Sequence, residues 1–290
     1  MGAMKRKAEE SFGSGHKWNR GKKIGEGGFG SVFVAFTKRP FMETDHMPEA
    51  MAVKSARITE SKSIKYELEV FRDLNNQGGS CPFIIDHYGE EVTWSDEGEE
   101  VYNLALEVAW GSLARLIKVL GHGLPETDVR RYTCDILEGV RHIHKCGYVH
   151  CDLKPENILL VENEDDDDYC YSLVAKVADL GLAKKKDEIQ DSWRGTPMYL
   201  SPEVVLYNEQ EQPSDIWAVG CIVLEMLTGE RPRNHLYHRE SDTLYIVDGM
   251  EPQIPDTISS LARDFLGCCL SEARCTAEEL LSHPFVAGYR

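Results

Sequence analysis

The sequence predicts an α+β protein of two lobes, a small β-rich lobe with one key helix and a larger lobe built mainly of helices. Three observations support this: strand-like patterning up to about residue 108, one helical interruption within it, and helical periodicity after residue 111. A strand-rich part followed by a helix-rich part favours separate lobes, joined near 107–111 with a cleft between them.

The first lobe is expected to contain three strand regions and one helix. The strand regions are KKIGEGGFGSVFVAFT, MAVKSAR and VYNLALEVA, which alternate or are rich in β-branched residues. Within ESKSIKYELEVFRDL, the apolar residues Ile64, Leu68, Phe71 and Leu74 recur every three or four positions. This spacing predicts an amphipathic helix of about four turns that packs against the sheet.

Helical periodicity dominates the second lobe, in SLARLIKVL, TDVRRYTCDILEGVRHIHKCG, SDIWAVGCIVLEMLTG and TAEELLSHPF. The acidic stretch ENEDDDDYCYS at 162–172 lies between two short strand candidates, ILLV and LVAKVAD. Like charges repel, so a solvated hairpin tip is favoured over a metal or partner site. A calcium loop would need alternating ligands and a turn glycine, which this stretch lacks.

Composition limits the classes of function. The 290 residues carry a net charge of −17, which argues against a general binder of nucleic acid or of anionic membranes. No apolar run of about 18 residues and no secretory segment is evident, which argues against membrane insertion and export and favours a cytoplasmic location. The chain is also expected to be a monomer. The nine cysteines form no CxxC pair, which disfavours structural zinc and indicates reduced, mostly buried thiols.

The first 17 residues are expected to form a disordered tail. Its opening MGAM resembles an expression scar in front of Met4. The run Lys5, Arg6 and Lys7 leaves open a weak nuclear signal beside the cytoplasmic location, although a solvated tail is the favoured interpretation.

Gly25, Gly27 and Gly30 form a GxGxxG pattern that occurs in more than one nucleotide-binding fold. Here GSVFVAF continues as a second strand rather than a helix, which disfavours a dinucleotide fold and predicts a glycine-rich hairpin. Backbone N–H groups of such a hairpin can approach phosphates closely. A plain flexible hairpin is the alternative, and Val32 is expected to face the adenine side of the cleft.

Lys54 lies inside the apolar run MAVKSA, where a cation is costly unless an anion meets it. On the predicted helix, Glu69 points about 200° away from Glu67, so only one of the two can face Lys54. The candidate partner is Glu67, because it shares the inward face of that helix with Phe71. Together they can hold the lysine amine on the α- and β-phosphates of a nucleotide. Snorkelling of Lys54 into solvent is the alternative.

The stretch VHCDLKPENILL places Asp152, Lys154 and Asn157 close together. A hydroxyl that attacks a γ-phosphoryl group needs an acceptor for its proton, a cation near the transferred charge and oxygen ligands for magnesium, which these three supply in that order. Asp179, in VADLGLAKK, adds a carboxylate for the same hard cation, and Gly181 gives the following turn its freedom.

From Trp18 to Phe285 the chain resembles the eukaryotic protein kinases. The resemblance is carried by GEGGFGSV, AVK, HCDLKPEN, DLG, GTPMYLSPE and SDIWAVG, in the order of the family. It implies the bilobal protein kinase fold over 18–286, with an N-lobe at 18–108 and a C-lobe at 109–290, and ATP and Mg²⁺ as cofactors.

The resemblance also implies a role for each matching residue. The catalytic residues are Asp152 as base, Lys154 on the γ-phosphate, and Lys54 paired with Glu67. Asn157 and Asp179 hold the metal, His150 is structural, packing with Leu180 and Phe71, and Glu203 pairs with Arg274. The nucleotide site comprises Ile24, Gly25, Glu26, Gly27, Gly28, Phe29, Gly30, Val32, Ala52, Lys54, Leu106, Glu107, Val108 and Leu159.

Cys151 departs from the family pattern, because many kinases have an arginine there that receives an activation-loop phosphate. Ahead of its GTP segment the loop offers only Ser192 for phosphorylation, and it carries Asp187, Glu188 and Asp191. We therefore hypothesise activity that does not depend on loop phosphorylation. Redox sensitivity of Cys151 is disfavoured, since nothing in the sequence lowers the pKa of its thiol.

Lys154 within KPEN and Thr196 within GTPMY resemble serine/threonine kinases. The stretches WNRGKKIGEGGFGSVFVA, SDIWAVGCIVLEMLTGERP and TAEELLSHPFV resemble the small plant mitogen-activated protein kinase kinase kinases, whose substrates are mitogen-activated protein kinase kinases in stress and hormone signalling. A pseudokinase scaffold and a small-molecule kinase are the alternatives. The first is weakened by the presence of every catalytic residue, the second by GTPMYLSPE, which builds a peptide platform in relatives.

Overall fold

The computed structural model describes residues 12–28, 30–38, 47–163, 173–232 and 252–288. The chain divides into two compact units. The first comprises residues up to Glu69 together with Asp86–Val108, and the second comprises Val70–Ile85 together with the chain from Ala109 onward. The division confirms an α+β architecture in which strands dominate the first unit and helices the second.

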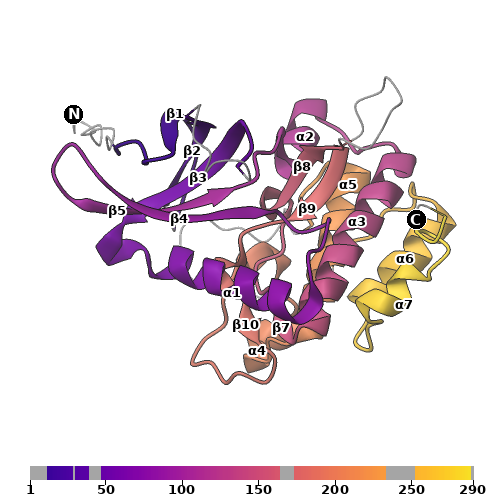
Figure 1. Ribbon diagram of the computed structural model, residues 1–290. Coiled ribbons are helices and arrows are strands. Elements are labelled where there is room, and N and C mark those ends of the chain that lie inside the picture. Colours follow the sequence, from indigo (N-terminus) through magenta and orange to yellow (C-terminus); the bar gives the residue numbers. More distant parts are fainter. Residues whose placement is uncertain (1–11, 29, 39–46, 164–172, 233–251, 289–290) are drawn as a thin grey trace, which may run out of the picture. The chain divides into compact units, whose positions relative to one another are not determined.

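The first unit is built on an antiparallel sheet of five strands in the order β1-β2-β3-β5-β4. The strands are β1 (Trp18–Gly27), β2 (Gly30–Thr37), β3 (Ala50–Arg57), β4 (His87–Trp94) and β5 (Glu100–Leu106). Figure 1 shows β4 and β5 as a long hairpin. The central position of β3 explains why six of its eight residues are buried.

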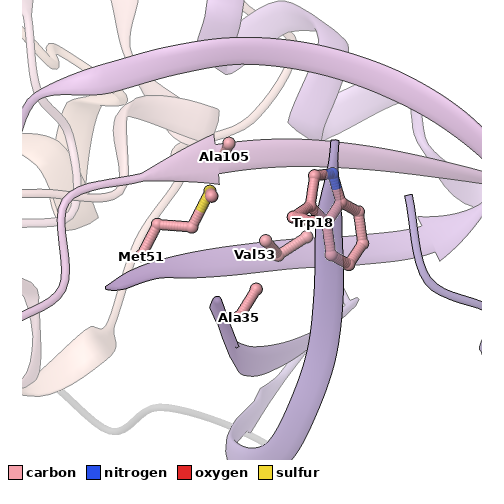
Figure 2. Close-up of a cluster of buried hydrophobic side chains, with 5 residues drawn as sticks. All are labelled: Trp18, Ala35, Met51, Val53 and Ala105. Carbon is pink, nitrogen blue, oxygen red and sulfur yellow. The ribbon is translucent and has the colours of Figure 1, made fainter. Parts of the chain in front are cut away.

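One face of this sheet carries a cluster of buried apolar side chains, Trp18, Ala35, Met51, Val53 and Ala105, drawn in Figure 2. Met51 and Val53 alternate with Ala52 and Lys54 along β3, as the two-residue period of a strand requires. The same strand therefore brings Lys54 to the opposite face of the sheet from the Trp18 cluster.

The expectation of a disordered tail over 1–17 is wrong for residues 12–17. Phe12 is buried, stacks edge-on against Phe33 with ring centroids 5.9 Å apart and forms a bridge with Ser95. The backbone N–H of Gly13 donates to Trp94 O at 3.0 Å. The sequence signal was too short to show this, because a single aromatic residue makes the contact. Residues 1–11 lie outside the described part of the chain.

The predicted helix is confirmed as α1 (Lys62–Gly78), and its four periodic residues Ile64, Leu68, Phe71 and Leu74 are all buried. It follows a 3-10 turn at Ile58–Glu60 and ends before Gly79, whose φ of +75° is the left-handed conformation that closes many helices.

The second unit is mainly helical. Its helices are α2 (Leu113–Leu120), α3 (Glu126–Lys145), α4 (Pro202–Tyr207), α5 (Gln212–Thr228), α6 (Ser260–Leu270) and α7 (Ala277–Leu281). Helix α3 packs against α5 and α7, and α5 also packs against α6. Residues 214–226 of α5 are all buried, which is typical of a central core helix.

Short strands and 3-10 turns connect these helices. The strands are β6 (Gly111–Ser112), β7 (Tyr148–Val149), β8 (Ile158–Glu162), β9 (Leu173–Val177) and β10 (Lys184–Lys185), which pair as β6-β8-β9 and as β10-β7. The turns are Pro155–Asn157, Leu180–Leu182 and Pro197–Tyr199.

Strands β8 and β9 form the antiparallel pair predicted on either side of the acidic stretch, with Glu162 opposite Leu173. The hairpin tip itself, residues 164–172, lies outside the described residues. Among the described residues, no helix is both long and apolar enough to cross a membrane.

Candidate active site

The glycine-rich stretch forms the hairpin between β1 and β2, as its continuation into a second strand predicted. Gly27 pairs with Gly30, whose φ is +141°. A Cβ at Gly30 would lie 2.5 Å from Ser55 O, so only glycine fits there. At Gly27 and Gly28 a Cβ would meet nothing within 4 Å, which leaves the backbone of the turn open to a ligand. Phe29 lies outside the described residues.

Lys54 and Glu67 form a buried ion pair within the first unit. Lys54 Nζ lies 2.7 Å from Glu67 Oε2, and the two residues are 8% and 1% exposed. Glu69 is exposed, as its position on the helix predicted. Strand β3 and helix α1 thus hold a lysine amine in a fixed position, where a second anion such as a phosphate can approach it.

The other nucleotide-site candidates fall on both units. Ala52 on β3 is buried opposite Leu106 on β5, Val32 on β2 is half-buried, and Ile24 and Glu26 on β1 are exposed. Glu107 N–H donates to Asp86 O at 2.9 Å, while Asp86 N–H donates to a Glu107 carboxylate oxygen at 3.1 Å. Val108 ends the first unit, and Leu159 belongs to the second, on β8 opposite Ser112.

Three polar side chains meet around the carboxylate of Asp152 in the second unit. Lys154 Nζ lies 2.7 Å from Asp152 Oδ2, and the Thr196 hydroxyl donates to Asp152 Oδ1 at 2.7 Å. Lys154 Nζ also donates to Thr196 Oγ1 at 2.8 Å, and Asn157 Nδ2 donates to the Asp152 backbone oxygen at 2.8 Å and to Oδ2 at 3.2 Å. Asp152 is 6% exposed, so its carboxylate is oriented by the protein rather than by bulk water.

The backbone of the loop that carries Asp152 is held by Asp215 on α5. Its carboxylate accepts the N–H of His150 at 2.8 Å, the N–H of Cys151 at 3.1 Å and His144 Nε2 at 2.9 Å. Cys151 needs this support because its φ of 69° is unusual for a residue with a side chain. Asp215 therefore positions Asp152 through the backbone.

His150 is fully buried and structural. Its Nδ1 accepts the backbone N–H of Asp152 at 3.2 Å, and its Nε2 lies 3.1 Å from Ala178 O. A neutral imidazole with its proton on Nε2 satisfies both contacts. The ring thus links the loop of Asp152 to the residue that precedes Asp179.

Asn157 and Asp179 lie at the same end of the β8–β9 hairpin. Asn157 precedes β8 and Asp179 follows β9, where Ile158 is opposite Val177 and Ala178 N–H donates to Asn157 O at 2.9 Å. The amide nitrogen of Asn157 is engaged with Asp152, which leaves its carbonyl oxygen as the group suited to a cation. A carboxylate and an amide oxygen form a donor set that fits Mg²⁺.

The segment from Lys184 to Gly195 is held by a network of ion pairs. Lys184 Nζ, almost fully buried, lies 2.6 Å from Glu211 Oε1 and donates to Glu188 O at 2.9 Å. Arg194 donates to Glu188 Oε1 at 3.2 Å and to Ala183 O at 3.1 Å. Glu188 also accepts the backbone N–H of Lys185 at 3.1 Å. Glu188, an acidic residue of this segment, is thus the partner of Arg194.

Two further contacts tie this segment to the loop of Asp152. Gln210 Nε2 donates to Cys151 O at 3.3 Å and to Arg194 O at 2.8 Å. Gly195 has a φ of +106°, and a Cβ there would lie 2.2 Å from Cys151 O. The close approach of the two backbones therefore requires glycine, and it places Thr196 beside Asp152.

The surroundings of the Cys151 thiol keep it protonated and unreactive. Its Sγ donates to Val149 O at 3.5 Å, the side chain is buried, and burial raises the pKa of the thiol with a further contribution from Asp215. A thiol kept protonated is a poor nucleophile, which agrees with the sequence-based interpretation.

Glu203 and Arg274 form the pair implied by the resemblance, with Arg274 Nη2 donating to Glu203 Oε2 at 2.9 Å and Nη1 to Oε1 at 2.5 Å. Arg274 also stacks over Trp217, 5.0 Å from the ring. Burial acts to raise the pKa of Glu203, but hydrogen bonds from Arg274 and Ser201 outweigh it and hold that pKa below its usual value.

Sequence reasoning assigned no role to Asp215, Gln210 or Glu211, which fix the loops around Asp152. Asp215 stands within SDIWAVG, a motif that the sequence singled out, so its presence was visible but not its partners. Its contact with His150 joins residues 65 positions apart, and no local pattern encodes such a distance.

Comparison with known proteins agrees with this geometry. The protein kinase domain matches residues 18–286. Mitogen-activated protein kinase kinase kinase 20 of Arabidopsis thaliana is 40% identical over 93% of this chain and 78% of its own length. Mitogen-activated protein kinase kinase kinases 18 and 17 of the same plant are 36% and 35% identical, over 78% and 69% of their lengths. The chain therefore belongs to the protein kinase family, as a serine/threonine kinase that uses ATP.

Proposed function

We propose that the chain is a mitogen-activated protein kinase kinase kinase that transfers the γ-phosphoryl group of ATP to serine or threonine hydroxyls of mitogen-activated protein kinase kinases. The single observation that carries the chemistry is the cluster of Lys154, Thr196 and Asn157 around the Asp152 carboxylate. The substrate class is supported by the names of the relatives, which align over nearly the whole chain.

Asp152 is placed to act as the base. A carboxylate held by two donors at fixed positions can accept the proton of a substrate hydroxyl as that oxygen attacks phosphorus. Lys154 places a positive charge next to the same carboxylate, where negative charge on the transferred group develops. Thr196 links the two by accepting from Lys154 and donating to Asp152.

Asn157 and Asp179 are the residues that would hold Mg²⁺, which when bound neutralises charge on the phosphates. Lys54, held by Glu67, is proposed to bind the α- and β-phosphates, and the open backbone at Gly27 and Gly28 to approach them. These roles follow from the residue types and from the positions in which the structure holds them.

We also propose that the enzyme needs no phosphate on its activation loop. In the described segment from Lys184 to Gly195, Glu188 already supplies the anion that Arg194 binds, and Lys184 is neutralised by Glu211. An added phosphate would therefore find Arg194 and Lys184 already engaged by carboxylates.

A panel of catalytically inactive mitogen-activated protein kinase kinases, incubated with the purified chain and ATP, tests the substrate assignment. Mapping of the phosphorylated residues by mass spectrometry should locate label in the activation segments of one or more panel members. An Asp152→Asn chain serves as the control and should give none. Label found only elsewhere, or at equal levels with the control, would contradict the proposal.

A further inference from the structure

Two cysteines lie close to the junction of helices α6 and α7. Figure 1 shows both helices in yellow near the C-terminus. Cys268 lies in the last turns of α6, and Cys275 lies just before Thr276, the residue that caps α7. Arg274, which holds Glu203, is the neighbour of Cys275 in this loop.

The two cysteines are joined by a backbone hydrogen bond. Cys275 N–H donates to Cys268 O at 3.2 Å. The backbone contact limits the distance between the two Cα atoms to about 7 Å, since N and O lie about 1.5 and 2.4 Å from their own Cα atoms. That limit coincides with the largest separation that a disulfide can bridge.

Cys269 follows Cys268 in the sequence but points to a different side of α6, so only Cys268 can pair with Cys275. Cys269 is fully buried against Gly220 of α5, where a Cβ on the glycine would lie 2.7 Å from the cysteine Cβ. Successive residues point about 100° apart around a helix, so Cys268 turns away from α5 toward the surface. Cys268 and Cys275 are both partly exposed and line the same hollow of about 470 Å³. A small oxidant can therefore reach them while it cannot reach Cys269.

We propose that Cys268 and Cys275 form a reversible disulfide when the protein meets a peroxide, and that this bond locks the loop that presents Arg274 to Glu203. The thiolate of one of the two cysteines attacks one peroxide oxygen, so that an S–O bond forms, the O–O bond breaks and water leaves after protonation. The sulfur of the other cysteine then displaces the hydroxyl group as a second water, with formation of the S–S bond. Both sulfurs are oxidised and the peroxide is reduced.

The inference is independent of the proposed kinase activity, because it concerns thiol chemistry remote from Asp152.

The experiment treats the folded chain with a slight excess of hydrogen peroxide and maps the peptides without reduction. The wild-type chain should yield a linked peptide joining Cys268 to Cys275, lighter by two hydrogen atoms and restored by a reducing agent. The bond should raise the melting temperature by about 2–4 °C, since it closes a loop of about eight residues in a chain of this size. Cys81→Ser, at a partly exposed cysteine elsewhere, is the matched control and should leave the link intact.

Single substitutions test for the sulfenic acid intermediate. In Cys268→Ser, a sulfenic acid on Cys275 should accumulate and be trapped by dimedone, and in Cys275→Ser the same should be found on Cys268. Thermal melting of the untreated variants shows that each is folded. Recovery of unlinked Cys268 and Cys275 peptides from the treated wild type would overturn the proposal. So would a link from either cysteine to a third residue.

Discussion

The two units hold Lys54 and Lys154, the lysines proposed to act in phosphotransfer, in different ways. In the first unit Lys54 and Glu67 are 8% and 1% exposed, so two charges are taken out of water together. In the second unit Lys154 has a side chain 20% exposed and shares Asp152 with the neutral donors Thr196 and Asn157. A buried pair loses its compensation when either partner is removed, whereas a mixed cluster keeps part of its hydrogen bonds. The buried pair of Lys54 and Glu67 is therefore expected to stabilise the fold as well as to serve the proposed chemistry. The cluster around Asp152 is expected to serve chiefly the chemistry.

The largest expected effect comes from breaking the buried pair. Lys54→Met should lower the free energy of unfolding of the first unit by about 3–5 kcal/mol, because it leaves Glu67 charged without its cation. The double variant Lys54→Met with Glu67→Leu should recover most of that loss while phosphotransfer stays absent. Urea denaturation followed by tryptophan fluorescence measures the stability.

Lys154→Met is the matched variant in the cluster, and it should cost less than about 1 kcal/mol of stability because Thr196 and Asn157 still donate to Asp152. Equal losses of stability in the two methionine variants would contradict the claim that the buried pair contributes more to the fold than the cluster around Asp152.

A second prediction uses Asp135, a carboxyl of α3 that lies outside both sites and accepts Ala175 N–H at 3.0 Å. Burial raises the pKa of Asp135 to about 6. The hydrogen bond from Ala175 and the charge of Arg131 act to lower that pKa, and the charge of Glu138 raises it further. Its folded-state pKa is above the unfolded value, so its contribution to stability is present at low pH and is lost as the pH rises through about 6.

Asp135→Asn should therefore stabilise the chain by roughly 1–2 kcal/mol at pH 7.5 and by roughly a third as much at pH 4.5, after allowance for partial exposure. Melting temperatures of both chains across this pH range measure the difference. A benefit that does not change with pH would show that ionisation of Asp135 is not its source.

A smaller effect is expected at Glu188, whose pair with Arg194 is partly exposed on both sides. Glu188→Gln keeps the size of the side chain and removes its charge, so we expect a loss of no more than about 1 kcal/mol. The loss should be local. Hydrogen exchange of the peptide covering 184–195 should become several times faster, while exchange in α5 stays unchanged. Glu272→Gln, at an exposed acid elsewhere, should change neither peptide.

The smallest effect is expected at Ser192. Its side chain is exposed, and Arg194 and Lys184 are engaged by Glu188 and Glu211, so Ser192→Ala should change kcat/KM less than about twofold. Steady-state phosphorylation of a protein substrate measures this. Loss of nearly all activity in the variant, or strong activation by a phosphate on Ser192, would refute independence from loop phosphorylation.

The sequence predicted what local periodicity and residue chemistry determine. The spacing of Ile64 and Leu68 predicted α1, and the angle between Glu67 and Glu69 around that helix selected the partner of Lys54, because both depend only on neighbouring positions. The contacts of Phe12 with Phe33 and of Asp215 with His150 were not predictable, since they depend on how distant segments pack.

The same distinction applies at the candidate active site. Asp152, Lys154 and Asn157 stand within six positions and were identified from their chemistry alone. Thr196 reaches Asp152 only because Gly195 allows two backbones to approach closely, and the sequence by itself does not reveal which backbone that glycine must meet.

The most direct test of the central claim, that Asp152 acts as the base of a protein kinase, is the rate of label transfer from ATP to a protein substrate by Asp152→Asn. The change keeps the shape of the side chain and the hydrogen bond from Thr196 but removes the proton acceptor, so the rate should fall about 10²–10⁴-fold. Asp256→Asn, at a fully exposed carboxylate, should retain the full rate. A rate for Asp152→Asn within a factor of two of the unaltered chain, with both proteins folded, would contradict the account.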